Sequence, residues 1–411
     1  PAAAADTRQQ SRRPHAARRC RAITRTAARR QDFLNLLLLP MHTQSIELLS
    51  GSPGIRQSLQ VLRFGTPGAR PKVYIQSALH ADEVPAILVA HHLVHLLAHA
   101  EREGHIAGEI VLVPFANPIG LGQTLLGQHQ GRFDLRDGGN FNRGYAELAA
   151  KVVDQVRPAL TQDVAHNTHT IRKALVQAVD ALTAVNPTQD LKIKLLGLAV
   201  DADVVLDLHC DTDAVMHVYA LTPQAEIAEQ LGAALGARAL LLATESGDSP
   251  FDEACTRPWF DLQKLLPEFP IDLACFGATV ELRGEADTSH LLAEQDAQGL
   301  CAFLAQRGVL TGTAESLRSP QCVPTPLSGS EPITAPHAGV VVFHRTPGER
   351  VVAGDVIADV VDALTGTVTQ LRCKSDGLLY ARCGSRWAVP GKRLAKIAGT
   401  SLARTGKLLS P

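Results

Sequence analysis

The chain has 411 residues, of which 45% are hydrophobic and only 4% aromatic. This is enough to bury one large aliphatic core and to leave material for a second, smaller domain. The formal net charge is −1, but residues 1–40 hold nine arginines against two acidic residues, so the rest of the chain is acidic, at −8. An acidic body argues against a nucleic-acid-binding protein, which needs a basic surface.

The first forty residues differ from the rest of the chain. They contain no Met before Met41. They are rich in Arg and poor in acidic residues, as a mitochondrial transit peptide is, but their only Ser is Ser11. The apolar run at 33–39 has no small-residue cleavage site after it and is far shorter than the roughly 20 residues of a membrane span. We expect residues 1–40 to be a disordered leader or upstream translation, with the natural start at Met41 and no membrane association.

Eight cysteines are scattered along the chain, and none forms a CxxC pair. This spacing is typical of reduced thiols rather than of a disulfide framework. We therefore expect a cytoplasmic protein.

Apolar strands alternate with helical stretches from about residue 45 onward. A helix should open at Pro85, where a missing backbone N–H costs nothing. The pattern predicts strands at 72–78, 109–114, 202–208 and near 214–220 and 277–283, and further helices at 146–160 and 168–184. Such alternation predicts an α/β layer architecture over residues 41–312.

The composition changes after this domain. Residues 313–335 are rich in Ser, Pro, Thr and Gly, which predicts a linker. Residues 336–400 contain short β-rich runs separated by Gly, and their pattern resembles a biotinyl/lipoyl-type sandwich. No Lys occupies the expected hairpin at 362–366, so a lid or assembly role fits this small all-β domain better than a carrier role.

Two segments at predicted strand ends offer metal ligands. His80 and Glu83 lie three residues apart between a strand and a helix, and His209 closes the strand at 202–208. Hydrolytic zinc sites use three protein ligands, often two His and one Glu, and leave a fourth position for water. Ligands bind at such strand ends in open α/β sheets. The alternative is that each His is only hydrogen-bonded to a neighbouring loop.

A second group of histidines lies within the helix that Pro85 opens. His91, His95 and His99 recur every four residues, which places them on one helix face, and His92 lies beside them. No carboxylate alternates with them as in an HExxH motif. We expect a solvated or lightly packed face.

Two further segments contain candidates for substrate chemistry. In the loop at 136–143, two arginines and Asn142 suit the capture of a carboxylate, although solvated arginines on a surface loop are commoner. Glu281 lies inside an apolar strand, where an ionised carboxylate is costly without a function or a partner. Arg283, two residues on and on the same face, is the alternative partner in a salt bridge.

Taken together, these segments resemble the succinylglutamate desuccinylase/aspartoacylase family, relatives of the zinc carboxypeptidases. The motifs occur in the family's order over about residues 45–312, and the β-rich C-terminal part also matches the family's layout. They are His80-xx-Glu83, Asn117-Pro118, Asn142-Arg143, Asp207-Leu208-His209 and Thr279-Val280-Glu281-Leu282-Arg283-Gly284. The resemblance implies a zinc carboxypeptidase-like mixed sheet flanked by helices, with a small C-terminal all-β domain.

The resemblance also implies roles for individual residues. One Zn²⁺ per chain would be bound by His80, Glu83 and His209. Glu281 would be the general base, and Arg136 would polarise the scissile carbonyl. Asn142 and Arg143 would hold the substrate carboxylate.

One position departs from the family pattern. Relatives often have an Asp two residues before the Asn-Arg pair, where this chain has Asn140. If that Asp orients a ligand His, the orientation must here be altered or supplied by Asp207 or Asp134.

The expected activity is zinc-dependent hydrolysis of the amide bond of a small N-acyl amino acid or related compound. The expected partner is therefore a small-molecule substrate, with no nucleic acid and no membrane, and a homo-oligomer remains open. The alternatives are a zinc carboxypeptidase acting on peptides and a non-catalytic zinc-binding protein.

Overall fold

The computed structural model describes residues 42–312 and 319–409. The predicted leader at 1–40, the predicted start at Met41 and the first part of the predicted linker, 313–318, lie outside the described residues.

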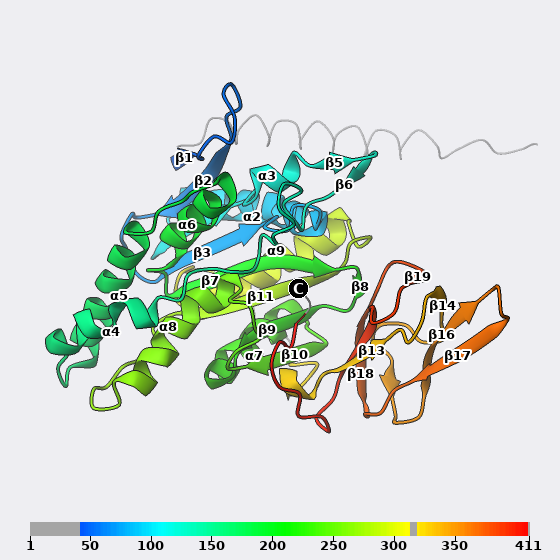
Figure 1. The fold of residues 1–411 in the computed structure, drawn as a ribbon. Helices are drawn as coiled ribbons and strands as arrows, with labels where there is room; N and C mark the ends of the chain where they lie inside the picture. The colour runs from blue at the N-terminus through cyan, green and yellow to red at the C-terminus, as the bar shows by residue number, and fades with distance from the viewer. Residues whose placement is uncertain (1–41, 313–318, 410–411) are drawn as a thin grey trace, which may run out of the picture. The chain divides into compact units, whose positions relative to one another are not determined.

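A mixed nine-stranded sheet forms the centre of the main domain, in the order β1-β2-β4-β3-β7-β11-β9-β10-β12 (Figure 1). Its central strands β4, β3, β7 and β11 are parallel neighbours, flanked by the antiparallel strands β2 and β9. The strands are β1 (His42–Glu47), β2 (Ser58–Gly65), β3 (Lys72–Ser77), β4 (Glu109–Val113), β7 (Val204–Asp211), β9 (His217–Leu221), β10 (Ala239–Ala243), β11 (Phe276–Gly284) and β12 (Pro324–Pro326). A separate hairpin is formed by β5 (Thr124–Leu125) and β6 (Gln128–His129).

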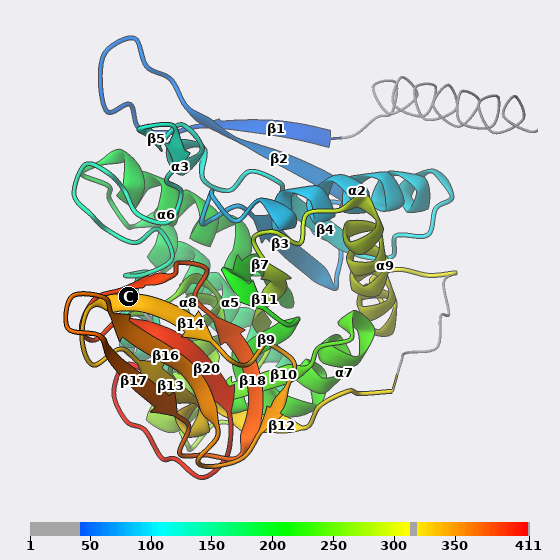
Figure 2. The same ribbon diagram turned by 90° about the vertical axis from the view of Figure 1, so that its right-hand side faces the viewer.

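Helices cover both faces of this sheet. Strands β3 and β4 are buried at every position, as expected for parallel strands covered on both faces. Helices α2, α7 and α9 lie on one face, and α4, α5, α6 and α8 on the other (Figure 2). The helices are α2 (Val84–Arg102), α3 (Pro118–Leu121), α4 (Ala149–Val156), α5 (Val164–Asp180), α6 (Pro187–Ala199), α7 (Ala225–Leu235), α8 (Phe251–Leu265) and α9 (His290–Gln306).

The predicted helices are present with shifted bounds. The stretch at 146–160 contains α4 followed by the short 3₁₀ helix η1 (Arg157–Ala159). The helix predicted at 168–184 begins earlier, because the Asp163 side chain accepts a hydrogen bond from the backbone N–H of His166 and caps α5. Helix α6 was not predicted, although its Asn186 cap and Pro187 are a typical start signal.

Helix α2 is the one helix in the described ranges that is long and apolar enough to cross a membrane. Its buried positions, Leu93 and Leu97 among them, lie in the core of the unit, and its neighbours are α9 and strands β2, β3 and β7. Core helices of folded domains have similar length and composition, so the length and composition of α2 are only weak evidence for a membrane span.

The C-terminal part is built only of β-strands and short turns, in two antiparallel sheets. One sheet contains β13 (Glu331–Thr334), β15 (Arg350–Val351), β18 (Gly377–Arg382) and β20 (Arg393–Ala398); the other contains β14 (Gly339–Phe343), β16 (Val356–Asp362), β17 (Thr367–Arg372) and β19 (Trp387–Ala388). The predicted fold class, an α/β domain with a mixed sheet and a small all-β C-terminal part, is confirmed. The predicted linker also contains ordered strands: β12 pairs with β10 in the main sheet, and β13 belongs to the C-terminal part.

A short strand after β7 connects the main sheet with the C-terminal part. Directly after β7, the chain forms β8 (Asp213–Ala214), which pairs with β18 of the C-terminal part. The backbone N–H of Val215 adds a hydrogen bond to Tyr380 O. The end of β7 is therefore held between the main sheet and the C-terminal part.

Candidate metal centre and active site

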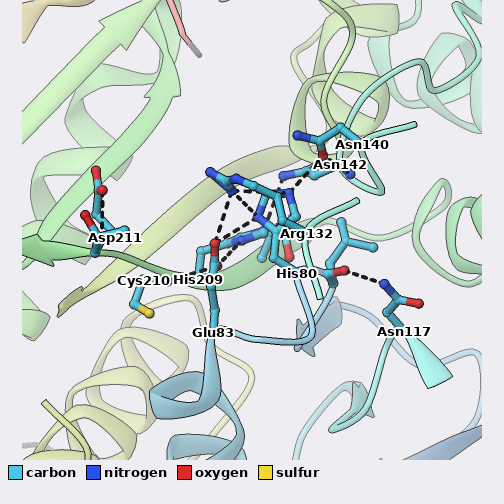
Figure 3. Close-up of polar contacts among 12 residues, drawn as sticks. His80, Glu83, Asn117, Arg132, Asn140, Asn142, His209, Cys210 and Asp211 are labelled. Carbon is cyan, nitrogen blue, oxygen red and sulfur yellow. Dashed lines mark hydrogen bonds and ion pairs between the residues drawn. The ribbon is translucent and has the colours of Figure 1, made fainter. Parts of the chain in front are cut away.

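His80, Glu83 and His209 meet at the carboxyl ends of the central strands (Figure 3). His80 follows β3, Glu83 precedes the first residue of α2, and His209 lies in β7. Their potential ligand atoms all lie within 4.8 Å of one another. The Glu83 carboxylate is 2.9 Å from His80 Nδ1 through one oxygen and 2.7 Å from His209 Nδ1 through the other.

In each imidazole, the ring nitrogen that does not face Glu83 contacts a polar partner. His80 Nε2 donates to Asn140 Oδ1 at 2.9 Å, and His209 Nε2 lies 2.9 Å from Asp207 Oδ2. Such partners orient a ligand imidazole and leave its other nitrogen for a metal. Asn140 thus takes the position of the family's Asp, and Asp207 supplies a carboxylate to the second histidine. Asp134, the other carboxylate suggested to orient a ligand His, binds Arg136 instead.

The cluster combines one ionised carboxylate with two imidazoles whose pKa values are shifted in opposite directions. Burial disfavours the charged form of Glu83, but the two imidazoles lower its pKa well below the ordinary range, so the carboxylate is ionised. Burial and Arg132 lower the pKa of His80 to about 4, which leaves its ring neutral. Burial also opposes protonation of His209, yet Asp207 and Glu83 raise its pKa well above the usual value. Two imidazoles and one carboxylate, all buried, are the same residue types as the donor set of many hydrolytic zinc sites.

Arg132 is the arginine beside this cluster, and sequence reasoning missed it. Its Nη1 lies 2.7 Å from His80 Nδ1 and 3.3 Å from Glu83 Oε1. The preceding Gly131 permits this approach: a Cβ there would lie 2.0 Å from the backbone nitrogen of Asp82. The glycine before Arg132 was the available signal in the sequence.

The structure does not bring Arg136 to the cluster. Its guanidinium binds the buried carboxylate of Asp134, with Nη2 to Oδ2 at 2.6 Å, and also the Thr188 hydroxyl. Arg136 is also absent from the residues that line the cavity described below. Arg132, and not Arg136, is therefore the arginine of this loop that contacts the cluster.

Glu281 lies beside the cluster on β11, where it is the register partner of His209 in β7. Its Oε2 is buried and has no hydrogen-bond partner among the described residues. Arg283, the alternative salt-bridge partner, binds Asp296 on α9 instead, with Nη1 to Oδ1 at 3.2 Å. Burial, followed by repulsion from Glu83, raises the pKa of Glu281 to about 8.

Asn142 and Arg143 line the same cavity as His209, and Asn142 Nδ2 lies 3.3 Å from His209 Nε2. Asn142 Oδ1 accepts a hydrogen bond of 2.9 Å from the backbone N–H of Phe251, at the first residue of α8. Lys192 also holds this loop, because its Nζ donates to the backbone carbonyls of Arg143 at 2.6 Å and Asn140 at 3.1 Å. These contacts direct both side chains toward one cavity.

A cavity of about 210 Å³ opens beside the cluster. Its lining includes both candidate ligand histidines and side chains from the C-terminal part, for which the sequence suggested a lid or assembly role. Among the lining residues are His80, Arg132, Asn142, Arg143, His209, Asp211, Glu281, Arg382, Arg393 and Lys396. The pair Arg382–Asp213, 2.6 Å between Nε and Oδ2, joins the two parts at its rim.

Comparison with known families agrees with this site. Residues 69–306 match the model of the succinylglutamate desuccinylase/aspartoacylase catalytic domain. The match spans more than half of the chain, so the protein belongs to the succinylglutamate desuccinylase/aspartoacylase family, as the resemblance predicted. The family consists of hydrolytic deacylases. No curated protein matches the chain.

Solved structures share the fold along most of the chain. A protein assigned to this family from Shewanella amazonensis is 29% identical, with a TM-score of 0.75 over 88% of this chain and 98% of its own. Another from Shewanella frigidimarina is 24% identical, with a TM-score of 0.76 over the same shares. The ectoine utilization protein EutE (DoeB) from Ruegeria pomeroyi is 16% identical, with a TM-score of 0.62 over 88% and 95%, a likeness of fold alone.

Proposed function

We propose that this protein is a zinc-dependent hydrolase that cleaves the amide bond of a small N-acyl amino acid or related compound. The observation that carries the proposal is the convergence of His80, Glu83 and His209 on one point, with Glu281 beside them in the same cavity. Residues 41–312 would form the catalytic domain, and residues 336–400 would complete its cavity. The seven described cysteines form no disulfide, which supports a reducing compartment such as the cytoplasm.

The three ligand residues would hold one Zn²⁺. When bound, this ion supplies Lewis acidity that activates water and polarises a carbonyl. Glu281 accepts the proton of the attacking water and returns it to the nitrogen that leaves when the C–N bond breaks. Burial raises the pKa of Glu281, which makes its carboxylate a stronger base than one in water.

Two groups of side chains would bind the substrate. Arg132, whose guanidinium reaches the cluster, stabilises the negative charge that develops on the carbonyl oxygen. Asn142 and Arg143 bind the carboxylate of the amino-acid part, for which a guanidinium offers a fork of donors.

The cavity favours a small substrate over a peptide. Side chains of β18 and β20, including Arg382 and Lys396, form part of its wall. The C-terminal part therefore occupies space that an extended peptide would need in the carboxypeptidase alternative. An unpaired Glu281 oxygen inside the cavity also argues against a purely structural metal site.

A substrate panel combined with one variant tests this proposal. We expect release of amino acid from N-acetyl or N-succinyl amino acids and none from C-terminal dipeptide substrates. Glu281→Gln should retain zinc but lose hydrolysis, whereas the exposed control Glu226→Gln should keep both. Near-normal turnover by Glu281→Gln would remove Glu281 from this role, and cleavage of peptides alone would favour the carboxypeptidase.

A further inference from the structure

Four histidines form a cluster on the face of the sheet covered by α2 and α9, away from the cavity. His91, His92 and His95 belong to α2, and His290 is the first residue of α9. We call them the α2–α9 histidine cluster. The two helices lie against each other in both views (Figures 1 and 2).

The rings form a continuous row across the two helices. His92 Nε2 lies 3.0 Å from His290 Nδ1. The ring centroids are 4.7 Å apart for His91 and His95 and 5.3 Å apart for His91 and His92. All four rings are exposed or half-buried, so an ion from solvent can reach them.

The closest pair is near the spacing of two ligands of one metal ion. Imidazole nitrogens bind zinc at about 2.0–2.1 Å, so two ligand nitrogens of a tetrahedral zinc ion lie roughly 3.3–3.4 Å apart. His92 and His290 are hydrogen-bonded at 3.0 Å, a few tenths of an ångström closer, so a small rotation of either ring reaches the ligand spacing. His91 is adjacent on α2, and Glu294 is one turn after His290 on α9, so rotation of an exposed side chain can bring a third ligand.

The charges around the pair are compatible with a cation. The groups that act on His92 are His91 and His95 of its own helix and His290 and Glu294 of α9. Partial burial and the neighbouring histidines lower the pKa values of His91 and His92. Their rings are consequently neutral at pH 7, the form in which imidazole binds metals.

We propose that His92 and His290 bind a second divalent transition-metal ion such as Zn²⁺, with His91 or Glu294 completing the site. This site is independent of the one formed by His80, Glu83 and His209. It joins the start of α9 to α2. Because Glu83 immediately precedes α2, metal bound here stabilises the helix next to a candidate ligand of the first site. Imidazole sites of this kind accept Zn²⁺, Ni²⁺ and Cu²⁺.

Zinc titration of chelator-stripped full-length protein by calorimetry tests the proposal. Wild type should bind two zinc ions per chain, and the double variant His92→Ala/His290→Ala should bind one. The control His99→Ala, on the same helix but outside the cluster, should bind two. A double variant with the same stoichiometry and affinities as wild type would overturn the proposal.

A second variant isolates the cluster from the candidate active site. His80→Ala/His209→Ala should still bind one zinc ion, and adding His92→Ala/His290→Ala should abolish this binding. Zinc should also raise the unfolding temperature of the first variant but not of the combined one. A folded His80→Ala/His209→Ala protein that binds no zinc would contradict the second site, while leaving the proposed activity untouched.

Discussion

Lys396, on β20 of the C-terminal part, forms an ion pair with Asp211, which follows His209 by two residues on β7. Both side chains are largely buried, with exposed fractions of 21% and 17%. Burial opposes the charge of Lys396, but Asp211 raises its pKa, and Lys396 in turn lowers the pKa of Asp211. The C-terminal part is thus bound to the strand that presents a candidate metal ligand.

Removal of Lys396 should destabilise the protein. Lys396→Met leaves the Asp211 carboxylate buried without its partner, and breaking a pair of this kind costs about 3 kcal/mol of unfolding free energy. Urea unfolding measures this loss. The double variant Lys396→Met/Asp211→Leu should recover most of it, and the exposed control Lys374→Met should match wild type. Equal stability of Lys396→Met and wild type would show that the pair contributes nothing.

The two arginines Arg132 and Arg136 should behave differently when replaced. Arg132→Ala removes the guanidinium beside the cluster, and we expect kcat/KM to fall about 10²–10³-fold, as when one donor to a developing oxyanion is lost. Arg136→Ala should leave kcat/KM within a few-fold of wild type, because its partners are Asp134 and Thr188. Steady-state kinetics on an N-acyl amino acid distinguish them, and the reverse order of effects would restore the original assignment to Arg136.

Asn140 should control metal affinity through His80. Asn140→Ala removes the acceptor that holds His80 Nε2, and the loss of such a partner typically weakens metal binding about 10–100-fold. Asn140→Asp, which supplies the family's carboxylate, should bind metal at least as tightly as wild type. Competition with a chromophoric chelator measures both affinities. An unchanged affinity in Asn140→Ala would mean that this contact does not orient the ligand.

Stability should depend on Asp134 at low pH. Burial would raise the pKa of Asp134, but hydrogen bonds from Arg136 and Thr188 lower it to about 2. A depressed pKa stabilises the fold above the unfolded value of 3.8, and this contribution is lost as pH falls through 2. Because Arg136 is about half exposed, we expect the contribution to be about 1–2 kcal/mol.

The comparison of two variants measures this contribution. Asp134→Asn should be less stable than wild type in urea at pH 6, and the difference should shrink progressively from pH 4 to pH 2.5. The exposed control Asp154→Asn should follow wild type throughout. If the difference in unfolding free energy between wild type and Asp134→Asn stays constant with pH, the loss of stability comes from packing and not from the charge of Asp134.

The fold and the ligand cluster could be predicted because their signals are local. Apolar runs in the sequence indicated strands β3, β7 and β11. Polar residues at the ends of such neighbouring strands lie together at one edge of a sheet. His80, Glu83 and His209 were found in this way, and the structure places them together.

The remaining residues of the site depend on contacts between distant segments. Arg132 and Arg136 are four residues apart in one loop. The packing of Gly131 on the Ala81–Asp82 backbone brings Arg132 to the cluster, whereas Asp134 and Thr188 hold Arg136 elsewhere. Lys396 reaches the cavity because β8 pairs with β18, a pairing between residues far apart in the chain. For Arg132 the only local signal is the preceding Gly131, and for Lys396 the sequence offers none.

The most direct test of the central claim is amide hydrolysis measured together with zinc content, before chelation, after chelation and after the return of Zn²⁺. The metal-free protein should be inactive, and activity should return in proportion to zinc in wild type and in His92→Ala/His290→Ala, but not in His209→Ala. Undiminished hydrolysis by folded, metal-free protein would contradict a zinc-dependent reaction at His80, Glu83 and His209.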